Sequence, residues 1–143
     1  MRILSIDYGD SKCGLAVTDA LGITAQGLET VFHKGSDKVL LKRLDEILEK
    51  YPEVDTIVVG MPLNMDGTAT IRAEVTEKFI HKLKCKYNKL KIDTIDERLT
   101  TVSSQKTLNF LDVKASKKKQ VEDTLAAVYI LETYMNRLKN RKE

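Results

Sequence analysis

Arg2-Ile-Leu-Ser-Ile-Asp7 is the stretch that decides the fold, because an apolar run suited to a buried strand ends on an aspartate. Gly14 to Asp19 and Thr24 to about Phe32 have the composition of two further short strands. Gly9 and Gly22 mark the turns between the three segments. The first third of the chain therefore predicts hairpins, with antiparallel pairing.

Downstream of the hairpins the apolar pattern changes to a helical period. Ser36 suits an N-cap, and apolar residues recur at 3.6-residue spacing to about Lys50, which predicts a helix. Asp55-Thr-Ile-Val-Val59 is a β-branched run typical of a buried parallel strand, and Gly60 to Gly67 is expected to form the loop after it. A second helix is predicted over Thr70 to Lys86.

The last third of the chain alternates in the same way. Lys91 to Ile95 predicts a strand, Leu99 to Leu111 a helix, and Val121 to about Arg137 the last helix. Two right-handed crossovers after the hairpins would place the first strand beside the Asp55 to Val59 strand, with helices on both faces. We therefore expect a single α/β layered domain over residues 1–143.

Three acidic residues fall where these elements should meet. Asp7 ends the first strand, Glu97 follows the Lys91 to Ile95 strand, and Asp123 opens the last helix. In open α/β sheets, sites form beyond the carboxyl ends of the parallel strands. Carboxylates brought together there repel unless cations hold them.

Asp123 shares a helix face with apolar residues, which places its carboxylate on the core-facing stripe. The apolar members of that stripe are Ala127, Ile130, Leu131, Tyr134 and Leu138. A charge there is costly unless it is paired. Oxygen ligands without nearby His or Cys suit Mg²⁺ or Mn²⁺, and two ions about 4 Å apart could activate a water for phosphodiester cleavage.

A simpler reading of the same acids stays open. Aspartates that end strands are often turn formers, and Asp123 could face the dipole at a helix N-terminus. His33 and His81 are isolated, so we expect packing or surface roles for both.

Lysines and arginines gather in three places, although the formal net charge is only +3. One cluster comprises Lys82, Lys84, Lys86, Lys89 and Lys91, a second Lys114 with Lys117, Lys118 and Lys119, and a third Arg137, Lys139, Arg141 and Lys142. The second cluster immediately precedes Asp123, so Lys117 to Lys119 are placed to hold a phosphate backbone. The other two have the pattern of solvated faces.

Composition excludes several classes of protein. No apolar run approaches the roughly 18 residues of a membrane span, and the first residues lack a secretory pattern. Cys13 and Cys85 lack the spacing of a zinc or redox site, so two reduced thiols are expected. These features favour a cytosolic protein.

Five motifs resemble, in order and spacing, those of the YqgF/RuvX family, and together they cover nearly the whole chain. They are Ile6-Asp-Tyr-Gly9, Gly14-Leu-Ala-Val17, Gly60-Met-Pro-Leu-Asn-Met-Asp-Gly-Thr68, Asp96-Glu-Arg-Leu-Thr-Thr101 and Glu122-Asp-Thr-Leu-Ala-Ala127. The resemblance implies an RNase H-like three-layer α/β/α fold with a mixed five-stranded sheet. It further implies a bacterial cytoplasmic, metal-dependent nuclease assigned to maturation of the 5′ end of 16S ribosomal RNA, with Holliday-junction resolvase as an older assignment.

By that resemblance the catalytic and metal-binding acids of the family fall on Asp7, Glu97 and Asp123, the same three that the pattern selected. The family usually carries basic residues at the positions of Ser11 and Lys12, and this chain keeps only Lys12 for substrate.

Two further residues have open roles. Asn64 could face the substrate phosphate or hydrogen-bond the backbone of its own turn. Arg98 is a plausible substrate contact by resemblance, although it could instead pair with Asp96.

Three function classes remain open at this stage. The first is a two-metal nuclease that acts on pre-16S rRNA or on branched DNA, with ribosomal particles as further partners. The second is an ATP-binding actin-like domain, which needs a second lobe that 143 residues cannot supply. The third is a non-catalytic ribosome-assembly factor that binds nucleic acid through its lysines. The sequence favours the first and leaves monomer and homodimer open.

Overall fold

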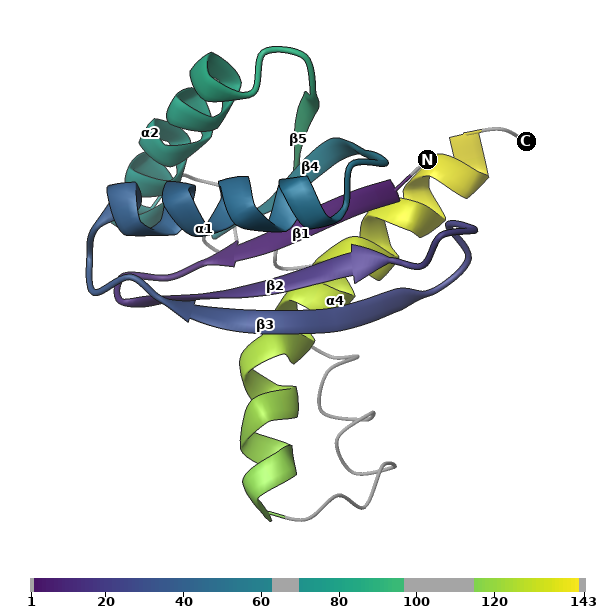
Figure 1. The fold of residues 1–143 in the computed structure, drawn as a ribbon, viewed down its shortest axis with the longest axis horizontal. Helices are drawn as coiled ribbons and strands as arrows, with labels where there is room; N and C mark the ends of the chain where they lie inside the picture. The colour runs from purple at the N-terminus through teal and green to yellow at the C-terminus, as the bar shows by residue number, and fades with distance from the viewer. Residues whose placement is uncertain (1, 63–69, 97–114, 142–143) are drawn as a thin grey trace.

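The computed structural model describes residues 2–62, 70–96 and 115–141, and for residues 115–123 and 140–141 it describes the backbone alone. Five strands and three helices occur in these ranges (Figure 1). They are β1 (Arg2–Tyr8), β2 (Lys12–Thr18), β3 (Ala25–Phe32), α1 (Asp37–Lys50), β4 (Val54–Met61), α2 (Ile71–Lys86), β5 (Lys91–Asp96) and α4 (Ala115–Arg141).

The five strands form one mixed sheet in the order β3-β2-β1-β4-β5. Strand β1 pairs antiparallel with β2 and parallel with β4, and β5 continues the parallel half. The predicted hairpins and the predicted position of the first strand beside the fourth are confirmed. Strand β1 is therefore the centre of the sheet, with a partner on each side.

Side chains of β1 alternate between two apolar layers, as the pleat requires. Leu4 and Ile6 are fully buried with residues of α1 and α2, including Leu44 and Phe79. Ile3 lies on the opposite face, in a cluster with the buried residues of α4. Helices thus cover both faces of the sheet, as predicted, and Figure 1 shows α1 and α2 on one side and α4 on the other.

Local signals explain where α1 and α2 begin. The Ser36 hydroxyl accepts a hydrogen bond from the Val39 amide at 3.4 Å, which caps α1 as the sequence predicts. The Thr70 hydroxyl accepts from the Ala73 amide at 2.9 Å and so caps α2. Each cap satisfies one amide that the first helical turn leaves without an intrahelical partner.

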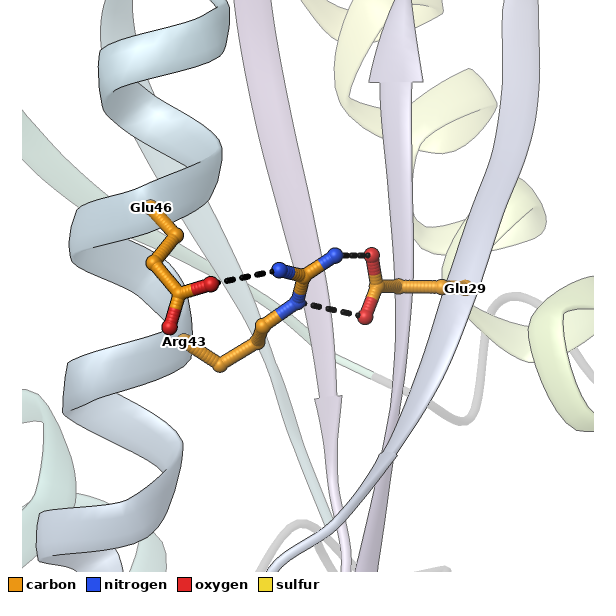
Figure 2. Close-up of polar contacts among 3 residues, drawn as sticks. All are labelled: Glu29, Arg43 and Glu46. Atoms are coloured by element: carbon orange, nitrogen blue, oxygen red, sulfur yellow. Dashed lines mark hydrogen bonds and ion pairs between the residues drawn. The ribbon is translucent and has the colours of Figure 1, made fainter.

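Arg43 ties the edge strand β3 to α1 (Figure 2). Its guanidinium donates two hydrogen bonds to the Glu29 carboxylate, from Nε at 2.8 Å and from Nη2 at 2.6 Å. A third bond, from Nη1 to Glu46, is 2.8 Å long. This fork fixes the outermost strand of the sheet against α1.

Several predicted boundaries are wrong. Strand β2 begins at Lys12 rather than Gly14, and β4 continues through Gly60 and Met61, which were expected in a loop, because both residues pair with β5. Helix α4 begins at Ala115 rather than Val121. The helix predicted over residues 99–111 lies outside the described residues.

Two compositional expectations can be compared with the structure. Cys13 is buried, Cys85 is exposed, and both are free thiols, as predicted. Among the described helices, none combines the length and the apolar character that a membrane crossing requires.

Candidate active site

Asp7 lies at the carboxyl end of β1, one residue before the strand ends, on the face that α4 covers. It is half-buried, and no hydrogen bond or ion pair joins its carboxylate to another described residue. Its neighbour on β2 is Gly14, and Gly60 is the next residue after the Ile6–Val59 pair that joins β1 to β4. Neither flanking residue carries a side chain, which leaves room beside the carboxylate.

A buried hydrogen bond joins the strand of Asp7 to the helix of Asp123. The Ser5 hydroxyl donates to the carbonyl oxygen of Ala127 at 2.6 Å. Asp7 follows Ser5 by two residues on the same face, about 7 Å along the strand. Asp123 precedes Ala127 by one helical turn, about 6 Å along the helix. The backbones of Asp7 and Asp123 therefore each lie within about 7 Å of the Ser5–Ala127 hydrogen bond, measured along their own strand or helix.

The position of Asp123 within α4 removes one of the simpler readings. Because α4 begins at Ala115, Asp123 lies in the interior of the helix and not in its first turn. A favourable interaction with the helix dipole is confined to the first turn, so it does not explain this acid. The apolar stripe predicted to share its face is confirmed, since Ala127, Ile130 and Leu131 are buried against the sheet.

Gly9 makes the tight connection after β1 possible. A Cβ atom at this position would lie 2.4 Å from the carbonyl oxygen of Lys12, closer than any side chain could approach. The buried ring of His33 supports the same connection, with Nε2 lying 2.9 Å from the Gly9 carbonyl oxygen. Because a carbonyl only accepts, this contact requires the tautomer that carries hydrogen on Nε2. A packing role for His33, expected from the sequence, is confirmed.

Tyr8 anchors the end of β1 on the face opposite Asp7. Its ring stacks on Phe79 with centroids 4.3 Å apart, and its hydroxyl donates to Asp37 Oδ1 at 2.5 Å. Burial, followed by this hydrogen bond, raises the pKa of Tyr8 far above its ordinary value. The phenol therefore stays protonated and holds position instead of acting as a base.

Asp37 is charged in this arrangement. Partial burial pushes its pKa up, but hydrogen bonds from Lys82 and Tyr8 outweigh that effect and hold the pKa of the carboxyl below its usual range. Arg72 supports the strand end from α2, donating from Nη2 to the Tyr8 carbonyl oxygen at 3.3 Å. Local sequence patterns do not reveal the roles of Tyr8, Asp37 and Arg72, because their contacts join segments far apart in the chain.

The remaining predicted site residues are placed only in part. Lys12 is the exposed first residue of β2, at the same sheet edge as Asp7. Lys117 to Lys119 lie in the first turns of α4, before Asp123 on the same helix. Asn64, Glu97 and Arg98 lie outside the described residues.

The donors around Asp7 are suited to a hard cation. Cys13 lies in the core on the opposite face, and burial raises its pKa to about 12, so it offers no thiolate. The Nε2 atom of His33 is committed to Gly9. Over the described residues, no three Asp, Glu, His or Cys side chains could together hold an ion. An oxygen site that starts from Asp7 fits Mg²⁺ or Mn²⁺ better than zinc.

Comparisons with known proteins agree with this architecture. A protein of Ruminiclostridium cellulolyticum named "Putative pre-16S rRNA nuclease" is 50% identical over 143 residues, which is 100% of this chain and 99% of that protein. A protein of the same name from Acetivibrio thermocellus is 48% identical over 136 residues, covering 95% of this chain and 96% of that one.

Solved structures share the fold at low sequence identity. Thermus thermophilus RuvC in complex with a Holliday junction substrate superposes with a TM-score of 0.64 at 14% identity, covering 97% of this chain and 96% of that one. A Fowlpox virus resolvase with Holliday junction DNA gives a TM-score of 0.61 at 14% identity, covering 96% and 99%. The RNase H-like three-layer fold is thereby confirmed. Residues 1–137 match the model of a family described as "RuvX: Holliday junction resolvase". The chain therefore belongs to the RuvX family.

Proposed function

We propose that this chain is a metal-dependent nuclease that hydrolyses phosphodiester bonds in precursor 16S ribosomal RNA. The observation that carries the proposal is the environment of Asp7, a half-buried carboxylate at the end of the central strand with no partner among the described residues. A charge in that position calls for a cation. The relatives from R. cellulolyticum and A. thermocellus, named as pre-16S rRNA nucleases, supply the substrate class.

In this proposal Asp7, Glu97 and Asp123 would together hold Mg²⁺ or Mn²⁺, with two ions expected. The bound metal would supply an activated water and stabilise the leaving oxygen of the cleaved bond. Ile95 faces α4, and Glu97 follows it by two positions, the spacing that an extended chain needs to keep both on one face. All three acids would then converge on the α4 face of the sheet edge.

The other residues of the site would position the substrate. Lys12 would contact a phosphate from the start of β2, and Lys117, Lys118 and Lys119 would do so from the first turns of α4. Asn64 and Arg98 are proposed as further contacts. Gly9 and His33 keep the connection after Asp7 in one conformation, so that the carboxylate is presented in a fixed place.

A second candidate function is resolution of four-way DNA junctions. The description of the family and the two resolvase structures favour it. The chemistry at the phosphodiester would be the same, and only the shape of the bound nucleic acid would differ. A third candidate, a non-catalytic assembly factor, would bind nucleic acid without needing the acids at all.

The three candidates separate in one experiment. Purified wild-type protein and the Asp7→Asn variant are incubated with Mg²⁺ or Mn²⁺ and, side by side, with precursor 16S RNA and a four-way DNA junction. We expect wild type to cut the RNA only with metal, and Asp7→Asn to fold and bind but not cut. Asp55→Asn is the matched control, since Asp55 is an exposed aspartate near the start of β4.

Each alternative has its own result in that experiment. Cutting of the junction alone would favour the resolvase, and metal-independent binding without cutting would favour the assembly factor. In this proposal residues 1–143 form one domain, which acts on ribosomal precursors in the cytoplasm. The domain would act as a monomer or a homodimer.

A further inference from the structure

Helices α1 and α2 both cover the face of the sheet away from α4 (Figure 1). Two ion pairs connect them: Lys82 Nζ lies 2.8 Å from Asp37 Oδ2, and Lys86 Nζ lies 2.7 Å from Asp45 Oδ2. These pairs hold the helices together without filling the space between their exposed sides. A groove therefore runs between α1 and α2.

Two hollows make up this groove, and they adjoin at the Asp45–Lys86 ion pair, whose residues line both. Their volumes are about 480 Å³ and about 520 Å³. Each is more than ten times the roughly 30 Å³ that one water occupies, so a phosphate with its sugar could enter. The cations that line the groove are Lys38, Lys42, Lys82, Lys86 and Lys89.

The groove has a strong excess of positive charge. Its five lysines face only two aspartates, Asp37 and Asp45, and each aspartate already has a lysine partner. Lys38, Lys42 and Lys89 make no hydrogen bond or ion pair with any other residue that the structure describes. Three cations are thus available to a ligand from outside the protein.

The arrangement of these cations suits an extended polyanion. Lys38 and Lys42 lie one turn apart on α1, about 6 Å along the helix axis. Lys89 continues the row beyond the end of α2. Several cations along an open groove match the repeated phosphates of a nucleic-acid strand, whereas a single small anion would need one enclosed pocket.

The groove also begins directly behind the candidate active site. Asp37, at one end of it, accepts the hydrogen bond from the Tyr8 hydroxyl. Tyr8 follows Asp7 in β1 and points to the opposite face. The groove and the candidate active site therefore lie at the same end of β1, on opposite faces of the sheet.

We propose that the groove between α1 and α2 binds the sugar–phosphate backbone of the substrate strand beyond the cleaved bond. The identity of the strand as RNA rests on the proposed function. The groove would add affinity through phosphate contacts that carry no sequence information. The groove would therefore raise the affinity for long substrates and leave unchanged the affinity for short substrates, which end near the cut.

The test compares two triple variants with equal loss of charge. The groove variant is Lys38→Gln, Lys42→Gln and Lys89→Gln, and the control is Lys50→Gln, Lys84→Gln and Lys139→Gln, three exposed lysines that line neither hollow. Both are made on the Asp7→Asn background, so that binding is measured without cleavage. The probe is a labelled single-stranded RNA with the 5′ precursor sequence, titrated at several salt concentrations.

Counterion release sets the expected size of the effect. Each phosphate contact on a single strand adds about 0.7 to the slope of log affinity against log salt, or about fourfold in affinity at 0.15 M salt. Loss of three contacts should weaken binding by about 50-fold and make the slope shallower by about 2. The control should bind as the parent does.

Several results would overturn the proposal. Equal weakening in both triple variants would mean that only total charge matters, and unchanged binding in the groove variant would mean that RNA does not enter. If the groove variant lost as much affinity for a short RNA that ends near the cut as for a long RNA, the three lysines would not bind the strand beyond the cleaved bond. If the wild-type protein cuts no RNA, the nuclease proposal fails, yet the binding comparison on the Asp7→Asn background still decides whether the groove holds the strand.

Discussion

Ser5 carries the most direct test of how the sheet holds α4. Its hydroxyl donates to the Ala127 carbonyl oxygen at 2.6 Å, and both residues are fully buried. Ser5→Ala removes the donor, and a neutral buried hydrogen bond contributes about 0.5–1.5 kcal/mol net. The carbonyl keeps its place in the helical hydrogen-bond pattern, so only part of a desolvation cost is added. We expect the free energy of unfolding to fall by about 1–2 kcal/mol.

Urea and thermal unfolding both measure this loss. At about 2.1 cal/mol/K per residue, a chain of 143 residues has an unfolding entropy of about 0.3 kcal/mol/K. The melting temperature should therefore fall by about 3–7 °C. Ser11→Ala is the matched control, because Ser11 is exposed and its hydroxyl makes no hydrogen bond to a described residue. A fall of less than about 0.5 kcal/mol would show that the hydroxyl does not hold the helix.

The same variant tests the link between this contact and the site. Ser5 lies on the strand of Asp7, and Ala127 lies on the helix of Asp123. If the contact sets the spacing of the two acids, Ser5→Ala should raise the Mg²⁺ concentration needed for half-maximal cleavage. Reduced stability with an unchanged Mg²⁺ dependence would refute that link while leaving the packing argument intact.

Three further changes have defined outcomes. A lysine at position 43 cannot form the two-bond fork on Glu29, so Arg43→Lys should lower the free energy of unfolding. Because the side chains of Arg43 and Glu29 are 41% and 29% exposed, the loss should be only about 0.5–1 kcal/mol, measured by urea unfolding, and it should shrink in high salt. The pKa of Asp37 in the folded protein lies below its unfolded value of about 3.9, so the charged carboxyl stabilises the fold above that pH and loses this effect as pH falls. The difference in unfolding free energy between wild type and Asp37→Asn should therefore close below about pH 4. Urea unfolding across pH measures it. Gly27→Ala would place a Cβ atom 2.7 Å from Thr124 Oγ1 and should cost about 1–3 kcal/mol, and adding Thr124→Ala should recover part of it in a double-mutant cycle.

Much of the fold could be predicted because its signals are local. The N-cap at Ser36, the stripe of α1 and the β-branched run of β4 each lie within a few consecutive residues. The sheet order followed from chirality once the elements were assigned, since crossovers in one sheet are right-handed. The same logic brought Asp7 to the correct sheet edge.

The errors lie where local signals were absent or misread. The start of α4 was predicted six residues late, at Val121 instead of Ala115, because no apolar period marks its first turns, although lysine and alanine favour helices. Burial of His33 depends on the ring of Tyr8 and the carbonyl of Gly9, which no periodicity reveals. The α1/α2 groove depends on ion pairs between residues more than forty positions apart.

The sheet has its first strand at the centre and its last helix across one face, and this order governs when the molecule becomes complete during synthesis. Of the described elements, β1 leaves the ribosome before all others and α4 leaves after them. Until α4 docks, Ile3, Ala16 and Val58 have no cover on their side of the sheet. A growing chain therefore cannot bring the three proposed acids together before α4 has been made and has docked, so the proposed cleavage of RNA would begin only after that step.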